Sequence, residues 1–466
     1  MKKTAKIEIA LLIIILVFAL IIRLYSLSNS PLWIDESISA IAGQKIIEKG
    51  VPIFDSGALY GRAYLFHYIE AFSMLLFGMN DFAVRFPSII FGLLTILLAY
   101  FIGREYSKSA GLICALFTAI FYLEVIYSRQ ARFYQLFQLA FFASIYFLYK
   151  SKQNKNWIYL ALISLIITID TQIAGIILAP LFIVFILYNK TLTKKQKYLV
   201  IIPIIILVYE LSSIFAIPMG NASTGSTYVE KYSSFARNMY YMLILAIPGI
   251  IWAFKKKKML TSSIVIPALI LLTGIFFIKM FAIRYAYFFI FPIILYSSLL
   301  MVFLYEKYGK LMIISILLLI LFPSNLFFPH TYATIIKPED YSYKDYSAPE
   351  INYKDIPSNL VNQIRTSKIF TLFSPGVSWY IKTPDYVFPF SMNGIGNDSI
   401  SYNRKDVYSG AKISMQRPNE DFYFIQDNYS RAKLKPFQVE NLKKVLEGCE
   451  EVYKNSDLIV YNCRSN

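Results

Sequence analysis

The chain has 466 residues, 57% of them hydrophobic and 17% aromatic, and its formal net charge is +17. This apolar content excludes a water-soluble enzyme of ordinary composition and predicts a polytopic membrane protein. The positive charge does not indicate binding to nucleic acid. The basic residues lie in short clusters between apolar runs, as is typical of the cytoplasmic loops of membrane proteins. With 2 histidines and 3 cysteines, a His-based triad, a multi-histidine metal site and a tetrathiolate zinc site are not expected.

The apolar runs predict about eleven transmembrane helices, some of them short. If the N-terminus is cytoplasmic, every clear lysine cluster falls on the cytoplasmic side, and the odd number of spans places the C-terminal part outside. Residues 156–189 could also form one long helix broken at Asp170, but a single span would place the lysines of 255–258 outside. The expected spans are 8–26, 85–103, 110–127, 133–149, 156–170, 172–189, 198–217, 238–254, 260–278, 284–304 and 309–323.

Two adjacent carboxylates, Asp35 and Glu36, lie shortly after the expected first span, at the membrane surface. Ionised side chains at a membrane boundary are costly unless they face water, a cavity or a partner, so this pair is a candidate functional site. The alternative is structural, because a helix N-cap and a first-turn acid would use the same residue types. Both interpretations fit the spacing.

The first extracytoplasmic loop, residues 28–84, is too long for a simple connector. Its apolar and polar positions alternate at helical spacing up to Lys49, which predicts a juxtamembrane helix lying along the membrane surface. A second apolar helix is expected from about Tyr64 to Phe77, ending at Gly78. The transmembrane domain, residues 1–323, therefore includes helices that do not cross the membrane.

Residues 324–466 have shorter apolar runs and more Pro, Asn, Asp and Ser, which predicts a separate soluble domain on the extracytoplasmic side. Strands alternating with helices indicate a small α/β layer. Cys449 and Cys463 flank the expected terminal strands in an oxidising compartment, so a disulfide between them is predicted. The expected strands are 369–373, 386–390, 422–425 and 458–461, and the expected helix is 437–446.

The expected extracytoplasmic face carries few carboxylates and many arginines. A guanidinium presents a planar fork that suits phosphate oxygens and keeps its charge near lipid. A carboxylate base facing an arginine-lined phosphate pocket is what sugar transfer from a polyprenyl phosphate requires, because a phosphate leaving group needs cationic stabilisation and no general acid. Each arginine alone could also be an anchor for lipid headgroups.

Several stretches carry a family resemblance when they are taken in chain order. They are Trp33-Ile34-Asp35-Glu36; Leu76-Phe77-Gly78 with Phe82-Ala83-Val84-Arg85-Phe86-Pro87-Ser88; Tyr127-Ser128-Arg129-Gln130-Ala131-Arg132-Phe133-Tyr134; and Arg284-Tyr285 with Phe291-Pro292. Together they resemble the GT-C superfamily, and within it the dolichyl-phosphate-mannose protein mannosyltransferases and the lipid A aminoarabinose transferases. The resemblance is good over about residues 20–150, looser to 323 and architectural beyond.

The resemblance implies an inverting glycosyltransferase of the GT-C type. Asp35 matches the family's acidic catalytic position and would take the proton of the acceptor hydroxyl, while Glu36 would orient Asp35 or bind the acceptor. Arg62 lies near the place where aminoarabinose transferases have an acidic-basic pair before two prolines, but here the acid and the prolines are absent. The metal site of that branch is therefore not carried over to this chain; a divalent metal stays possible, with no ligand assigned.

The other candidates fall into a donor group and an acceptor group. Arg129 and Arg132 are three residues apart and would share one face of a helix, while Glu124 is either an acceptor contact or a counter-ion to the arginines. Loop 218–237 would help to form a lid over the acceptor. The expected donor-phosphate residues are Arg62, Arg129, Arg132, Tyr134, Arg284 and Tyr285, and the expected acceptor-side residues are Glu124, Asp170, Tyr228 and Lys231.

The predicted function is sugar transfer from a polyprenyl (dolichyl or undecaprenyl) monophosphate to a glycan, lipid-linked or protein hydroxyl at the outer face of the plasma membrane. Because residues 324–466 show no recognisable β-trefoil pattern, a glycan or lipid-linked acceptor is favoured over a polypeptide, and protein O-mannosyl transfer remains an alternative. A flippase or transporter of the lipid-linked sugar is another. A receptor that only anchors the soluble domain would need no arrangement of acids and arginines.

Overall fold

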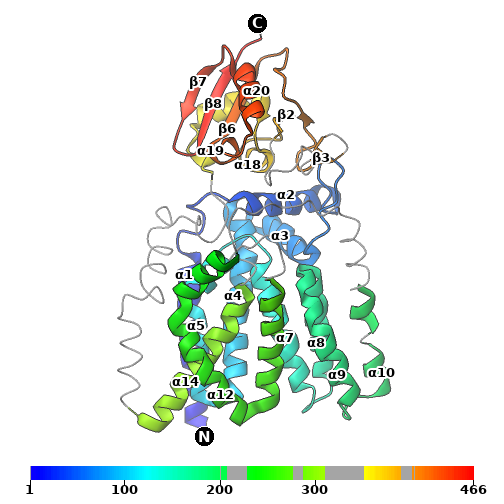
Figure 1. Ribbon diagram of the computed structural model, residues 1–466, viewed down its shortest axis with the longest axis vertical. Helices are drawn as coiled ribbons and strands as arrows, with labels where there is room; N and C mark the ends of the chain where they lie inside the picture. Colours follow the sequence, from blue (N-terminus) through cyan, green and yellow to red (C-terminus); the bar gives the residue numbers. More distant parts are fainter. Residues whose placement is uncertain are drawn as a thin grey trace. The chain divides into compact units, whose positions relative to one another are not determined.

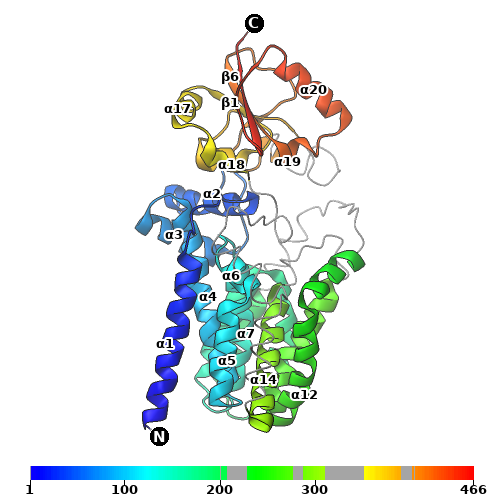
Figure 2. The same cartoon turned by 90° about the vertical axis from the view of Figure 1, so that its left-hand side faces the viewer.

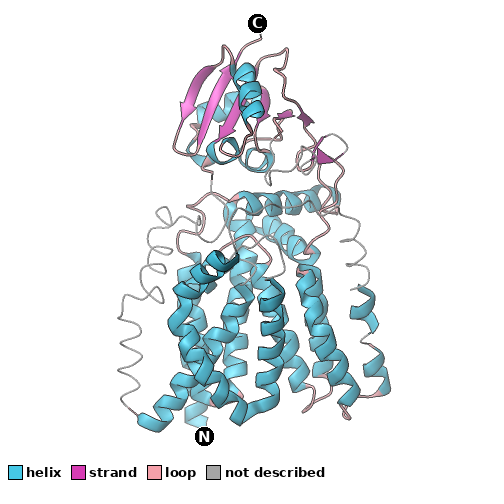
Figure 3. Cartoon of the chain, viewed as in Figure 1, coloured by secondary structure: helices cyan, strands magenta, loops and turns pink. Residues whose placement is uncertain are grey.

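The computed structural model describes residues 2–199, 201–206, 228–275, 287–309, 351–389, 401–402 and 405–465. The chain forms two compact units (Figure 1). In the part of the chain described, the first unit is helical and every strand belongs to the second (Figure 3). The first unit is Met1–Leu27, Arg85–Pro218 and Ser226–Tyr341, and the second is Ser28–Val84, Met219–Gly225 and Ser342–Asn466.

The first unit is built from apolar helices. Three helical stretches are long and apolar enough to cross a membrane, namely Lys6–Leu24, Asp81–Arg104 and Tyr287–Tyr308, and the pair Lys108–Ile120 and Tyr122–Ser128, bent by 63°, makes a fourth if it counts as one span. The helices are α1 (Lys2–Leu24), α4 (Asp81–Arg104), α5 (Lys108–Ile120), α6 (Tyr122–Ser128), α7 (Tyr134–Lys150), α8 (Trp157–Thr171), η1 (Ile173–Ile177), α9 (Leu178–Tyr188), α10 (Lys194–Tyr198), α12 (Tyr228–Ile275), η2 (Tyr287–Phe289) and α14 (Ile290–Tyr308).

The total of eleven spans stays a prediction. The expected span 309–323 lies almost wholly outside the described residues, and so do parts of 198–217, 260–278 and 284–304. The break expected near Asp170 is present, because α8 ends at Thr171 and η1 begins at Ile173. The two expected spans that meet in α12 are separated by non-helical backbone at Lys257.

Helices of the first unit approach each other closely where one of them has a glycine. α12 packs along α14, and a Cβ at Gly249 of α12 would overlap the Tyr296 carbonyl of α14. Between helices in lipid, close backbone approach of this kind supplies packing energy that apolar side chains alone do not. Other helix pairs in contact are α7 with α8, α5 with α14 and α1 with α5.

The second unit contains a mixed sheet of eight strands in the order β3-β4-β5-β2-β1-β6-β8-β7. β1 pairs in parallel with β2 and β6, whereas β6, β8 and β7 pair antiparallel. All four predicted strands and the predicted helix are present. The strands are β1 (Lys368–Thr371), β2 (Tyr386–Val387), β3 (Ser401–Tyr402), β4 (Lys405–Asp406), β5 (Lys412–Ile413), β6 (Phe422–Asp427), β7 (Glu450–Lys454) and β8 (Leu458–Cys463), and the helices of this region are η4 (Tyr353–Asp355), α17 (Ser358–Thr366), α18 (Ser374–Tyr380), α19 (Asn428–Arg431) and α20 (Pro436–Leu446).

Each face of this sheet has its own hydrophobic core. Along β1 the side chains alternate, so Ile369 packs into the core that contains Ile364 of α17, while Phe370 packs into the core that contains Leu442 of α20. Figure 2 shows α17 and α20 on opposite sides of the strands. The predicted disulfide between Cys449 and Cys463 is present, and Cys463 lies in the core on the α20 side.

The segment 28–84 shares the core on the α17 side. Its two predicted helices are confirmed as α2 (Ile34–Lys49) and α3 (Tyr64–Phe77), and α3 ends at Gly78 with a left-handed φ of 86°. Buried side chains of α2, among them Ile38 and Ile41, belong to the same core as Ile369 of the sheet. The long loop after the first span and the C-terminal region are therefore one folded unit.

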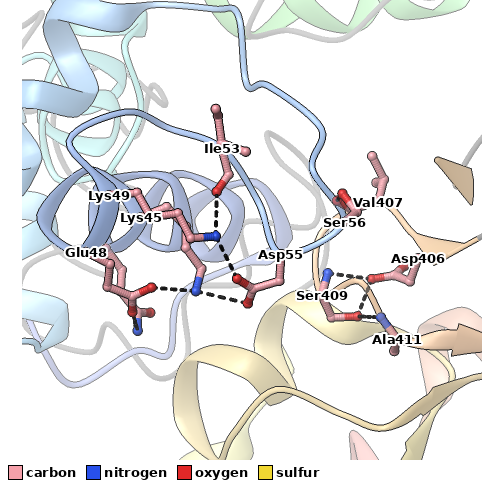
Figure 4. Close-up of polar contacts among 11 residues, drawn as sticks. Lys45, Glu48, Lys49, Ile53, Asp55, Ser56, Asp406, Val407, Ser409 and Ala411 are labelled. Carbon is pink, nitrogen blue, oxygen red and sulfur yellow. Dashed lines mark hydrogen bonds and ion pairs between the residues drawn. The ribbon is translucent and has the colours of Figure 1, made fainter. Parts of the chain in front are cut away.

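A polar contact also fixes the loop after α2 to the strand region (Figure 4). The Ser56 hydroxyl donates to the Val407 carbonyl at 2.5 Å, and Asp55 forms an ion pair with Lys45 at 3.0 Å. Gly410 has a φ of 69°, and a Cβ there would lie 2.8 Å from the Asp55 carbonyl. Only glycine fits this conformation and this close approach without strain.

A buried carboxylate makes the stability of the second unit depend on pH. Asp427 Oδ1 accepts the Ser430 N–H at 2.6 Å, Oδ2 has no hydrogen-bond partner among the described residues, and burial raises the pKa of Asp427 from 3.8 to about 6. The folded chain therefore binds this proton more tightly than the unfolded chain, so the free energy of unfolding should fall by up to about 3 kcal/mol as pH rises from about 4 to about 6.

The variant Asp427→Asn can keep the hydrogen bond to Ser430 but does not titrate. Thermal unfolding measured between about pH 4 and 7 should lose most of this slope in the variant. Asp406, whose pKa is also raised by burial, keeps its own contribution in both proteins. An unchanged slope would mean that another group titrates.

Candidate functional site

The predicted site residues are divided between the two units. Asp35, Glu36 and Arg62 belong to the second unit, whereas Glu124, Arg129, Arg132, Tyr134 and Asp170 belong to the first. Arg284 and Tyr285 lie outside the described residues. Tyr228 and Lys231 lie in α12, but their side chains are outside the described part. The candidate site residues therefore form two groups, one in each unit.

The adjacent carboxylates at the start of α2 have different environments. Glu36 is 1% exposed, and its Oε2 accepts the Trp33 N–H at 3.2 Å while the Ser37 N–H donates to the Trp33 carbonyl at 3.0 Å. Glu36 thus stabilises the first turn, which is the structural alternative considered for this pair. Asp35 is partly exposed. Of the two carboxylates, Asp35 is therefore the more exposed, and its role as a base stays a prediction.

A buried pair in α3 was missed by the sequence analysis. His67 Nδ1 lies 3.1 Å from Glu70 Oε2, and both side chains are fully buried. The pair lies near α2, because a Cβ at Gly43 would be 3.5 Å from Glu70 Oε2. The signal was a histidine and a glutamate three residues apart in an otherwise apolar helix. Arg62, just before this helix, is exposed.

In the first unit, Glu124 of α6 lies in a buried hydrogen-bond network. Gln138 Nε2 donates to its Oε1 at 2.8 Å, and the Tyr287 hydroxyl lies 2.7 Å from its Oε2. Gln135 extends the network, with its Oε1 2.5 Å from the Tyr287 hydroxyl and its Nε2 donating to Thr95 Oγ1 at 2.9 Å. Buried polar groups in a helical membrane unit need such partners. An acceptor role for Glu124 stays a prediction.

Glutamines and tyrosines of this network were not among the predicted residues. Gln135 and Gln138 are uncharged polar positions inside the apolar run 133–149, whereas the predicted residues are charged or aromatic side chains near span ends. A search for any polar residue within an apolar span would have found them.

Arg129 and Arg132 do not share a helix face as expected. α6 ends at Ser128 and α7 begins at Tyr134, so both arginines lie in the turn between them, where the Arg132 N–H donates to the Gln130 carbonyl at 2.7 Å. The polar stretch 128–132 separates the expected spans 110–127 and 133–149, so the break itself followed from the sequence, and only the shared helical face was wrong.

Arginines of the first unit satisfy carbonyls near the end of α1. Arg129 Nη1 donates to the Ile22 carbonyl at 2.9 Å and to the Tyr25 carbonyl at 2.8 Å, and Arg85 Nη1 donates to the Leu27 carbonyl at 2.7 Å. The last carbonyls of a helix lack intrahelical donors, so cations there are stabilising. These contacts give Arg129 a structural role, and its binding of donor phosphate stays a prediction.

The Arg132 guanidinium lies against two aromatic rings. Its guanidinium carbon lies 4.6 Å from the Phe133 ring centroid and 5.6 Å from that of Tyr134. Tyr134 contacts Tyr127 at 5.9 Å between centroids, and Tyr127 contacts Tyr287 at 4.2 Å. Arg132, Tyr134 and the Glu124 network are thus joined through one aromatic cluster. Asp170 lies in the last turn of α8 and is partly exposed.

Metal ligands are not gathered in the part of the chain that the structure describes, where no three His, Cys, Asp or Glu side chains are placed to hold an ion together. His67 and Glu70 supply two such groups. We therefore assign no metal site.

Comparison with known proteins now gives this arrangement a context. The dolichyl-phosphate-mannose-protein mannosyltransferase family matches residues 62–212, and no curated protein sequence matches the chain. ArnT from Cupriavidus metallidurans in the apo state is similar with a TM-score of 0.66 and 10% identity, over 98% of each chain. The same protein bound to undecaprenyl phosphate gives a TM-score of 0.59 and 11% identity, over 99% of this chain and 98% of ArnT.

A third solved structure extends the comparison to another transferase. The Archaeoglobus fulgidus oligosaccharyltransferase, in complex with Zn and sulfate, has a TM-score of 0.56 and 11% identity, over 97% of this chain and 72% of that one. Identities this low establish the fold. The protein is a helical membrane protein with the GT-C fold and a C-terminal sheet region. The resemblance to the GT-C superfamily that the motifs indicated is confirmed.

Proposed function

We propose that the protein is an inverting glycosyltransferase that moves a sugar from a polyprenyl monophosphate to a hydroxyl acceptor at the extracytoplasmic face of the plasma membrane. The observation that supports this proposal most strongly is the similarity to ArnT over nearly the whole chain, because one ArnT structure is bound to undecaprenyl phosphate. The N-terminus would be cytoplasmic, and membrane lipids would surround the first unit.

In the proposed reaction, Asp35 is the general base. The acceptor oxygen attacks the anomeric carbon from the side opposite the phosphate, a C–O bond to the acceptor forms, and the bond to the phosphate oxygen breaks. The acceptor proton passes to Asp35, and the polyprenyl phosphate leaves as an anion. Glu36 holds the first turn of α2 through Trp33 and so positions the neighbouring base.

Arginine side chains would stabilise the departing phosphate. Arg132 is our first choice, because its guanidinium lies against the rings of Phe133 and Tyr134, and Arg129, which donates to carbonyls of α1, is the second. Contact with the ring faces orients the planar fork of Arg132, and such a fork suits two phosphate oxygens at once. Arg62, Arg284, Tyr134 and Tyr285 stay proposed members of the same donor site.

Replacing Arg132 by lysine tests this assignment. Lysine keeps the charge but loses the fork and the stacking, so the Kd for undecaprenyl phosphate should rise by about tenfold. Isothermal titration of the purified protein in detergent measures this Kd. Lys152→Arg, which exchanges the same residue types at an exposed position, should leave it unchanged. Wild-type affinity in Arg132→Lys would place the phosphate elsewhere.

The acceptor is a hydroxyl of a glycan or of a lipid-linked molecule in our proposal. Transfer to a protein hydroxyl is the second candidate, and the match of residues 62–212 to the protein mannosyltransferase family favours it. Incubating the protein with a labelled polyprenyl-phosphate sugar and separate glycan, glycolipid and peptide acceptors distinguishes the two. Absence of both transfer and donor hydrolysis would contradict the enzyme assignment and favour a transporter.

A further inference from the structure

A cavity of about 970 Å³ lies within the second unit. Residues from five segments line it: the turn after α1, α2, the start of α4 with the turn before it, the η4 region, and α17 with α18 and the turn that follows. Its volume is at the upper end of the range for sites that hold drug-sized ligands, so it exceeds the size of a single monosaccharide. It contains none of the residues assigned to the base or to the donor phosphate.

The wall of this cavity is fixed by a buried carboxylate. Asp81 is 5% exposed, and its Oδ1 accepts the Trp379 indole N–H at 2.9 Å while its Oδ2 accepts the Tyr380 hydroxyl at 2.9 Å and pairs with Lys354 at 2.5 Å. Tyr380 in turn accepts the Leu32 N–H at 2.6 Å. The charge of the Asp81 carboxylate is therefore neutralised by Lys354. The hydrogen bonds of this carboxylate hold the Trp379 side chain in place.

Two further cations of the cavity have no such counter-charge. Arg365 Nε donates to the Ile381 carbonyl at 3.2 Å, and Lys382 Nζ donates to the Ser367 carbonyl at 2.7 Å. Among the residues that the structure describes, no carboxylate forms an ion pair with either of them. The backbone carbonyls orient both side chains without cancelling their charge, so the cavity attracts anions.

Uncharged groups of the cavity suit a saccharide. Trp379 is partly exposed at the cavity and presents an aromatic surface against which the C–H face of a sugar ring can pack. Amide side chains of Gln44 and Asn80 lie in the same lining. Gln44 Nε2 donates to Glu48 Oε1, and Asn80 donates to the Phe77 carbonyl and accepts the Ala83 N–H, so each amide has a second N–H that can donate to a hydroxyl. An aromatic surface, amides and two uncompensated cations together match a sugar that carries acidic groups.

We propose that this cavity binds an acidic saccharide, one with phosphate or carboxylate groups, as the acceptor of the transferase. The proposed binding is inferred from the residues that line the cavity. The role of the saccharide as acceptor rests on the proposed function. Binding and transfer are therefore measured separately.

Binding is tested on the full-length protein in detergent by titration with trigalacturonate, which carries carboxylates, and with maltotriose, an uncharged saccharide of the same length. The double variant R365Q/K382Q should bind trigalacturonate about tenfold more weakly than the wild type. The matched control K443Q/K444Q removes two exposed charges from α20 in the same unit and should stay within about twofold of the wild type. Thr383→Asp, which adds a negative charge at an exposed position of the lining, should also weaken binding.

Three results would overturn the binding proposal. They are equal trigalacturonate affinity in R365Q/K382Q and K443Q/K444Q, equal affinity of the wild type for trigalacturonate and maltotriose, and displacement of trigalacturonate by vesicles containing phosphatidylglycerol. The last result would assign the cavity to lipid headgroups.

Donor turnover separates this proposal from the proposed function. In R365Q/K382Q the hydrolysis of a labelled polyprenyl-phosphate sugar without acceptor should stay at the wild-type rate, while transfer to an acidic acceptor falls about tenfold. Trigalacturonate binding in a protein that neither hydrolyses nor transfers the donor sugar would contradict the proposed function and leave the saccharide site standing. Undiminished transfer by a variant with weakened binding would remove the acceptor role.

Discussion

Asp35→Asn should lower sugar transfer by roughly 10²–10⁴-fold while the protein folds and inserts normally. The substitution keeps the size and shape of the side chain and removes the lone pair that takes the acceptor proton. Asp35 is partly exposed in the first turn of α2, and Glu36, not Asp35, accepts the Trp33 N–H. Loss of the charge should therefore leave that hydrogen bond intact.

The affinity for the donor lipid separates a chemical defect from a binding defect. In Asp35→Asn the Kd for undecaprenyl phosphate should match the wild type, because only the transition state needs the base. Asp421→Asn, the same exchange at an exposed position of the second unit, should keep full turnover. Wild-type turnover in Asp35→Asn would end its assignment as the base.

Local features of the fold could be predicted from the sequence. The helix Tyr64–Phe77 has the bounds that its apolar run and Gly78 indicated, and the terminal strands with their disulfide lie where short β-rich runs flank the cysteines. The break after Asp170 followed from charge placement between apolar runs. Each of these features depends on residues that are neighbours in the sequence. Hydrophobic periodicity and capping residues there indicate where a helix or strand begins and ends.

Associations between distant segments could not be predicted in this way. The expected division between residues 323 and 324 lies outside the described part. No pattern in the sequence indicates that 28–84 joins the C-terminal region in one unit. Ser56 contacts Val407 across 351 positions, and Asp81 contacts Trp379 across 298. Such pairings depend on shape and hydrogen-bond complementarity, which a single sequence does not display.

Because α2 and the sheet share one core, deleting residues 342–466 should abolish turnover and not merely acceptor use. Trp33, Ile34, Ile38 and Ile41 pack in the core that includes the sheet. Exposing four such side chains costs up to about 10 kcal/mol, which is comparable to the whole stability of a domain. The helix that begins beside Asp35 would lose its support, so donor hydrolysis should disappear together with transfer.

Donor binding should behave differently in the truncated protein. Arg129 and Arg132 belong to the first unit, so the Kd for undecaprenyl phosphate should change by less than about threefold in a correctly inserted truncation. Ile41→Asn in the full chain opens the same core at one position and should lower both the melting temperature and turnover. Val452→Asn, at a site that is 37% exposed, should lower neither. Full donor hydrolysis by the truncated chain would show that α2 keeps Asp35 in place without the sheet.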